Sequence, residues 1–160
     1  CALPILELAH YEWVELALDV SEDSLEIDGV DPQGDLIEGI PVLSPLAWSL
    51  QYAYPVHLIG EGFQPNEPPE QPSFLVVYRN RDHAVRFMES NSVTARLLEL
   101  IRDNDNHSGG ELLRRIAAEM GREDSEQVID FGASLLTDLA HYDILLGALT
   151  DVVAGTDPSA

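Results

Sequence analysis

Reactive side chains are few and widely separated in this sequence. None of the five histidines lies in a metal-binding spacing such as His-Glu-x-x-His, and they fall in different predicted elements: His10, His57, His83, His107 and His141. The single cysteine, Cys1, excludes an internal disulfide and any zinc or iron–sulfur site that needs several cysteines. We therefore expect surface or structural histidines, no metal site and no bound cofactor.

Two short motifs resemble functional ones but lack essential residues. The run 103–107 begins like a calcium-binding loop, yet Ser108 stands where position six needs glycine and Arg114 where position twelve needs glutamate. The run 132–134 (Gly-Ala-Ser) lacks the closing glycine of a nucleophile elbow and falls within a predicted helix, so Ser134 is not expected to attack a substrate. No catalytic constellation is left, and we predict that the protein is not an enzyme.

The charge of the chain argues against nucleic acid as a direct partner. Its 160 residues include 29 Asp and Glu against 8 arginines and no lysine, which gives a net charge of −21. All the arginines lie between Arg79 and Arg122, where acidic residues interrupt them. A DNA-binding surface needs clustered positive charge, because its affinity comes largely from neutralising phosphates and releasing counterions.

The purified chain is accordingly expected not to bind random-sequence duplex DNA near physiological salt, since even non-specific binding needs several phosphate contacts from basic groups. Fluorescence anisotropy of a labelled duplex, with a basic DNA-binding domain as positive control, measures this directly. A micromolar complex that weakens as salt is added would contradict the expectation.

Membranes are not predicted partners either. No stretch approaches the roughly 20 uninterrupted apolar residues that span a bilayer, and no basic segment precedes an apolar run as in an export signal. We therefore expect the protein to be cytoplasmic.

The first half of the chain predicts one helix and two strands. Apolar residues spaced three and four apart predict an amphipathic helix over 4–20: Leu6, Ala9, Trp13, Leu16 and Val20. An acidic loop over 21–35 follows, and the alternation over 46–53 indicates a strand with one buried face. Residues 56–59 are expected to form a short edge strand, and Trp13 and Trp48 to lie in the core.

The second half predicts a β-hairpin followed by three helices. The strands are 74–78 and 85–89, and Asn91 or Ser92 caps the first helix. Gly121 ends the second helix, and a capping box from Asp124 to Gln127 opens the longer third helix. The predicted fold is therefore α+β: a winged-helix-like module over 74–150, with an extra N-terminal helix and additional strands over 1–73, and a disordered tail over 151–160.

Three stretches of the chain resemble the C-terminal domain of the HvfC/BufC-type family. They are LELAHYEWVELALDVSED at the start, Tyr54-Pro55-Val56-His57, and VVYRNRDHAVRFMESNSVTARLLELI across the hairpin. The resemblance implies a non-catalytic partner of a multinuclear-iron oxygenase that modifies cysteines in a ribosomally made precursor peptide. It also implies an N-terminal helical domain before this region, which we expect to be absent from the chain that begins at Cys1.

The order of hairpin and helices is also similar to PqqD-type peptide-recognition modules, which bind a leader peptide as an added strand beside their last helix. This similarity implies a peptide or partner site on the strand and on the helix over 125–142: Val85, Arg86, Phe87, Met88, Glu89, Asp130 and Ser134. The strand 85–89 serves in this way only if it lies at a sheet edge, and the sequence leaves a central position equally open. If Val85 and Phe87 face the helices, Arg86 stands outward toward an acidic leader.

Two functions remain after this reading of the sequence. In the first, the protein is an adaptor that binds the iron oxygenase and presents the precursor peptide. In the second, it is part of a transcription regulator whose DNA-contacting domain is the missing N-terminal part. Gene neighbourhood separates them, because an adaptor gene should stand beside genes for an iron oxygenase and a small cysteine-bearing precursor.

Overall fold

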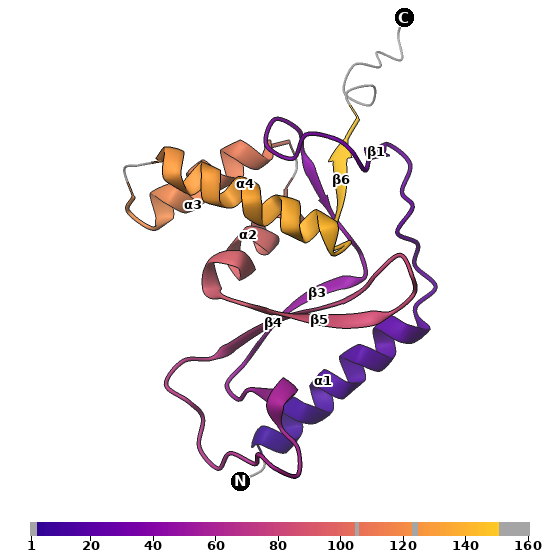
Figure 1. Ribbon diagram of the computed structural model, residues 1–160, viewed down its shortest axis with the longest axis vertical. Coiled ribbons are helices and arrows are strands. Elements are labelled where there is room, and N and C mark those ends of the chain that lie inside the picture. The colour runs from indigo at the N-terminus through magenta and orange to yellow at the C-terminus, as the bar shows by residue number, and fades with distance from the viewer. Residues whose placement is uncertain (1–2, 105, 123–124, 151–160) are drawn as a thin grey trace, which may run out of the picture. The chain divides into compact units, whose positions relative to one another are not determined.

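The computed structural model describes residues 3–104, 106–122 and 125–150 (Figure 1). These residues form a mixed α+β fold, as predicted. In chain order the elements are α1 (Leu3–Val20), β1 (Val30–Asp31), β2 (Pro41–Leu43), β3 (Ala47–Tyr52), the 3₁₀ helix η1 (Val56–Leu58), β4 (Ser73–Arg79), β5 (Val85–Ser90), α2 (Ser92–Arg102), α3 (Gly109–Glu119), α4 (Ser125–His141) and β6 (Leu145–Leu149).

The chain divides into two compact units, each assembled from two separate stretches. The first unit comprises Cys1–Asp23 and Leu46–Ala95, and the second comprises Ser24–Pro45 and Arg96–Ala160. This division differs from the predicted boundary between residues 73 and 74. The order of hairpin and three helices is as predicted, but the hairpin belongs to the first unit and α3 and α4 to the second. The predicted disordered tail lies outside the described residues.

The first unit is built on an antiparallel sheet in the order β3-β4-β5. The predicted hairpin is confirmed, with Val77 of β4 opposite Phe87 of β5. The predicted extra strand is also confirmed, because Trp48 of β3 lies opposite Val77 on its other side. Residues opposite each other share a sheet face, so Trp48, Val77 and Phe87 mark one face.

Helix α1 packs on that face through a side that the sequence reading did not select. Its buried residues are Tyr11, Val14 and Leu18, and the Tyr11 ring meets the Tyr52 ring of β3 edge-on. The stripe that predicted an amphipathic helix is instead exposed: Leu6, Ala9, Trp13, Leu16 and Val20. The prediction that Trp13 lies in the core is wrong, because this residue is 57% exposed, although its ring lies against the rings of His10 and the half-buried Trp48.

The hydroxyl groups of Tyr11 and Tyr52, which lie where α1 packs on the sheet, have raised pKa values and stay neutral. Burial, with the nearby carboxylate of Glu7, raises the pKa of Tyr52 to about 12. Burial and a hydrogen bond with Glu15 likewise raise the pKa of Tyr11. The Tyr52 hydroxyl lies 2.8 Å from Nδ1 of His10. The hydroxyl therefore has a hydrogen-bond partner although it lies between α1 and the sheet.

Arg79, at the end of β4, fastens the end of α1 to the sheet. Its guanidinium donates hydrogen bonds to four carbonyl oxygens at and just beyond the last turn of α1, those of Leu18, Asp19, Ser21 and Asp23. These carbonyls have no partner within the helix, and the cation also opposes the negative end of the helix dipole. Arg79 is accordingly buried, with only 8% of the residue exposed.

The short edge strand predicted over 56–59 is a 3₁₀ helix, η1. Pro55 precedes it with φ at −76°, and its carbonyl accepts a hydrogen bond from the Leu58 N–H. At the other side of this turn, the Glu7 carboxylate accepts hydrogen bonds from the backbone N–H groups of Ala53 and Tyr54. The chain therefore turns back toward α1 instead of continuing β3.

The second unit contains an antiparallel sheet in the order β1-β6-β2. This sheet was not predicted, because β1 lies in the expected acidic loop and each outer strand has only two or three residues. Helix α3 begins with a capping box between Ser108 and Glu111. Gly121, with φ at +67°, follows its C-terminal end as predicted. The capping box predicted at Asp124 falls on residues outside the described ones.

Helices α3 and α4 pack closely where α4 has a glycine. A Cβ at Gly132 would lie 2.3 Å from a Leu113 methyl carbon of α3, so a larger residue here would displace the Leu113 side chain.

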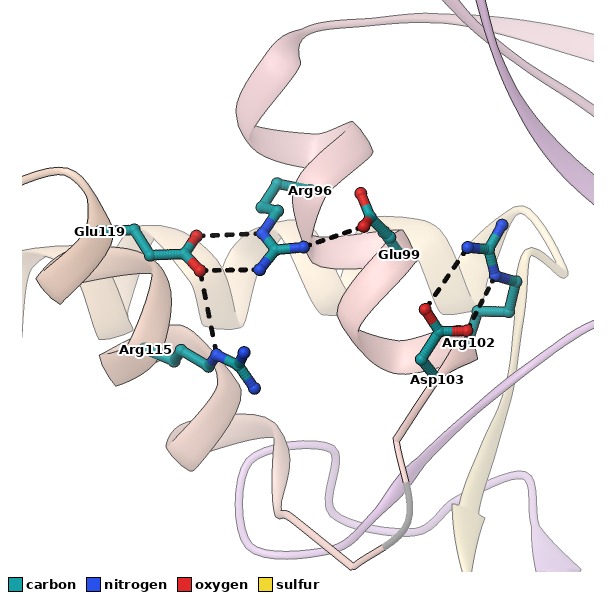
Figure 2. A network of polar contacts seen from close by, with 6 residues as sticks. All are labelled: Arg96, Glu99, Arg102, Asp103, Arg115 and Glu119. Atoms are coloured by element: carbon teal, nitrogen blue, oxygen red, sulfur yellow. Dashed lines mark hydrogen bonds and ion pairs between the residues drawn. The ribbon is translucent and has the colours of Figure 1, made fainter.

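Figure 2 shows the contact between α2 and α3. The Arg96 guanidinium forms a two-point ion pair with Glu119 (3.0 and 2.8 Å) and also donates a hydrogen bond to Glu99. Hydrogen bonding to Glu119 raises the pKa of Arg96, and the same bond lowers the pKa of Glu119.

Candidate peptide-binding edge

Strand β5 lies at an edge of its sheet. Among the described residues it pairs with β4 alone, over the register from Arg79–Val85 to Phe74–Ser90. The sequence left open whether this strand is central or at an edge, and the sheet order decides for the edge. A strand in this position presents backbone N–H and C=O groups with which an extended peptide can pair.

The register identifies which backbone groups of β5 point away from the sheet. The Arg79 N–H donates to the Leu46 carbonyl, and the Asn80 N–H donates to the Ala84 carbonyl. In an antiparallel ladder, bonded and non-bonded residue pairs alternate. Residues 74, 76 and 78 of β4 therefore bond with β5, through Ser90, Met88 and Arg86.

The outward backbone groups are consequently those of Val85, Phe87 and Glu89. Arg86 and Met88, by contrast, direct their N–H groups toward β4. A substitution that removes an edge donor must be made at one of the other three positions.

The side chains of β5 divide between the two sheet faces as the alternation predicts. Val85, Phe87 and Glu89 lie on the α1 face, but Phe87 remains 47% exposed because the strand lies at the margin of the sheet. On the opposite face Arg86 is exposed, as expected, and Met88 is half-buried. The edge therefore combines outward backbone groups with an apolar ring on one face and a cation on the other.

A buried histidine supports the edge from the α1 face. His57 of η1 has a side chain only 6% exposed, with its Nε2 atom 2.7 Å from a Glu89 carboxylate oxygen. Its ring also lies against the Phe87 ring, with 5.7 Å between the centroids. Its Nδ1 atom is buried and makes no hydrogen bond within the described part of the chain. Sequence reasoning gave His57 no specific role, because its partners are about thirty residues away and follow no local pattern.

The two remaining predicted site residues lie on α4. Asp130 and Ser134 are both exposed and stand one helical turn apart on one side of the helix. Exposed Phe131 lies beside them in sequence. The predicted site thus draws on β5 in the first unit and on α4 in the second.

Within 3–104, 106–122 and 125–150, no three His, Cys, Asp or Glu side chains are grouped so as to hold a metal ion. In this part of the chain no helix combines the length and the apolar character needed to cross a bilayer.

Comparison with known protein families shows a match over more than half of the chain. The sequence model of the HvfC C-terminal domain matches residues 44–140, which contain β3, η1, the hairpin, α2, α3 and all but the last residue of α4. No curated protein matches the chain.

Proposed function

The chain belongs to the HvfC C-terminal domain family, and from this membership we propose that it is a non-catalytic adaptor in peptide modification. It binds an iron-dependent peptide-modifying oxygenase and presents to it a ribosomally made precursor peptide. The ribosome makes the precursor peptide in the cytoplasm, and we propose that the adaptor binds the peptide and the oxygenase there.

The observation that carries the proposal is the edge position of β5. A precursor leader would add to the sheet as a further strand, pairing with the outward backbone groups of Val85, Phe87 and Glu89. Backbone pairing supplies affinity for any extended peptide, and the side chains beside it select the sequence. The half-exposed Phe87 ring favours an apolar leader residue, and Arg86 favours an acidic one.

Asp130 and Ser134 of α4 remain further proposed contacts for a peptide. The exposed carboxylate and hydroxyl one turn apart offer an acceptor and a donor to a peptide backbone.

Phe87→Pro is the variant that tests the edge. Proline removes the outward N–H at the centre of β5 but leaves the ladder donors of Arg86 and Met88 intact. We expect binding of the precursor peptide encoded in the same gene cluster to weaken about tenfold relative to Phe87→Ala, the effect of losing one hydrogen bond of about 1.4 kcal/mol. Fluorescence anisotropy of the labelled peptide measures the dissociation constants.

Phe87→Ala is the matched control, because it removes the same ring and keeps the N–H group. Circular dichroism must show that both variants are folded. Equal affinities of the two folded variants for the precursor would contradict the edge assignment. Binding that is weakened equally in both would assign recognition to the ring and not to strand pairing.

A further inference from the structure

Helix α1 carries apolar side chains on two opposite sides. One side, with Tyr11, Val14 and Leu18, is buried on the sheet. The other is a stripe of five exposed residues, which we call the outer stripe: Leu6, Ala9, Trp13, Leu16 and Val20. At about 100° per residue the two sides lie about 150° apart around the helix axis. In Figure 1, α1 runs along the β3-β4-β5 sheet.

The outer stripe has the spacing of a coiled-coil seam. Its members are separated by three, four, three and four residues, which is the alternation of a and d positions in a heptad repeat. A helix that only covers a sheet needs one apolar side. The second side, with four large side chains exposed by more than half, has the pattern that packs against another helix.

The flanks of the stripe are acidic or neutral. With Leu6, Trp13 and Val20 at a positions, Glu12 and Asp19 fall at g positions, where coiled coils place the charges that select a partner. Helix α1 contains no basic residue apart from a histidine. A second copy of this chain, with a net charge of −21, would bring acids against acids.

We propose that the outer stripe binds an amphipathic helix of another protein, one whose apolar seam is flanked by lysine or arginine. Trp13 is the expected anchor. It lies at the centre of the stripe, and its ring is supported by Trp48 (centroids 6.1 Å apart) and His10 (5.9 Å). A large exposed aromatic side chain whose ring packs against neighbouring rings is typical of the few residues that contribute most of the binding energy. Because the backbone of α1 is already ordered on its sheet, only the partner helix has backbone entropy to lose on binding.

This surface is separate from the β5 edge, so the inference stands or falls independently of the proposed function. The probe is a synthetic three-heptad peptide with leucine at a and d and lysine at e and g, compared with a peptide carrying glutamate at e and g. Isothermal titration calorimetry should show at least tenfold tighter binding of the lysine peptide to the full chain. Leu16→Glu, and independently Trp13→Ala, should each weaken that binding at least tenfold. Phe131→Ala removes an equally exposed apolar side chain on α4 and should leave it unchanged.

Charge reversal distinguishes the stripe from general attraction between a basic peptide and an acidic protein. The double variant Glu12→Lys with Asp19→Lys should reverse the preference toward the glutamate peptide. Glu61→Lys with Glu67→Lys makes the same change in net charge on an exposed loop and should leave the lysine peptide preferred. Equal effects of the two double variants would overturn the proposal. So would a dimer in sedimentation that Leu16→Glu dissociates, because the occupant of the stripe would then be a second copy.

Discussion

Arg79→Met is expected to lower the free energy of unfolding of the first unit by about 3–5 kcal/mol, the cost of leaving several hydrogen-bonded carbonyls without a charged donor. The guanidinium donates to four carbonyl oxygens at the end of α1. Methionine fills much of the same volume but donates no hydrogen bond. The carbonyl of Leu18, whose bond to Arg79 is fully buried, is the most costly to leave unsatisfied.

Tryptophan fluorescence during urea unfolding reports the stability of the first unit, because both tryptophans, Trp13 and Trp48, belong to that unit. Arg79→Lys should recover only part of the loss, since one ammonium cannot reach four carbonyls. The matched control is Arg86→Ala, on the neighbouring strand with its side chain exposed, which should change stability by less than about 0.5 kcal/mol. An Arg79→Met variant as stable as wild type would refute the role of Arg79 in capping α1.

Gly109→Ala is expected to destabilise the second unit by about 3 kcal/mol, the upper part of the range for overpacking a rigid site. A Cβ at this position would lie 1.8 Å from the backbone carbonyl oxygen of Leu36, and backbone cannot rotate away as a side chain can. The Gly109 N–H also donates to the carbonyl of Gly39, so any shift of the loop breaks a hydrogen bond as well. Far-UV circular dichroism in urea, together with hydrogen exchange of the α3 and β6 amides, reports the loss.

The adjacent glycine is the control for that experiment. A Cβ at Gly110 would meet the Ile37 methyl carbon and carbonyl oxygen at 3.3 Å, a tight distance that a small adjustment relieves. Alanine there also gains helix propensity. Gly110→Ala should therefore stay within about 1 kcal/mol of wild type. Equal destabilisation by the two substitutions would show that the contact with Leu36 is not the cause.

The elements with strong local patterns could be predicted from the sequence, and the side of α1 that packs could not. Alternation identified β3 and the hairpin, and the turn residues bounded α2 and α3. In α1, periodicity identified the helix but the stronger apolar stripe, with Trp13 and Leu16, is the exposed one. Periodicity reports that a side is apolar and does not say what covers it. The side of α1 that packs on the sheet is the one that carries Tyr11, whose ring contacts the Tyr52 ring of β3.

Features that depend on contacts between residues far apart in the sequence could not be predicted from local patterns. The β1-β6-β2 sheet joins short segments whose pairing only the fold reveals, such as Val30 with Leu149. The capping role of Arg79 and the contact of His57 with Glu89 likewise join residues far apart in sequence. For the candidate site, the sequence identified the strand 85–89, but only the register showed which of its backbone groups point outward.

The alternation of the two units along the chain has a consequence for synthesis on the ribosome. The last segment of the first unit ends at Ala95, so a nascent chain can complete that unit before the second unit has been made. The second unit must wait, because β6, the central strand of its sheet, is the last described element to be made. Until Leu145–Leu149 emerges, β1 and β2 have no strand to pair with, although they were synthesised before most of the first unit. Translation order therefore imposes a folding order in which β1 and β2, the two strands of the enclosed segment 24–45, pair last.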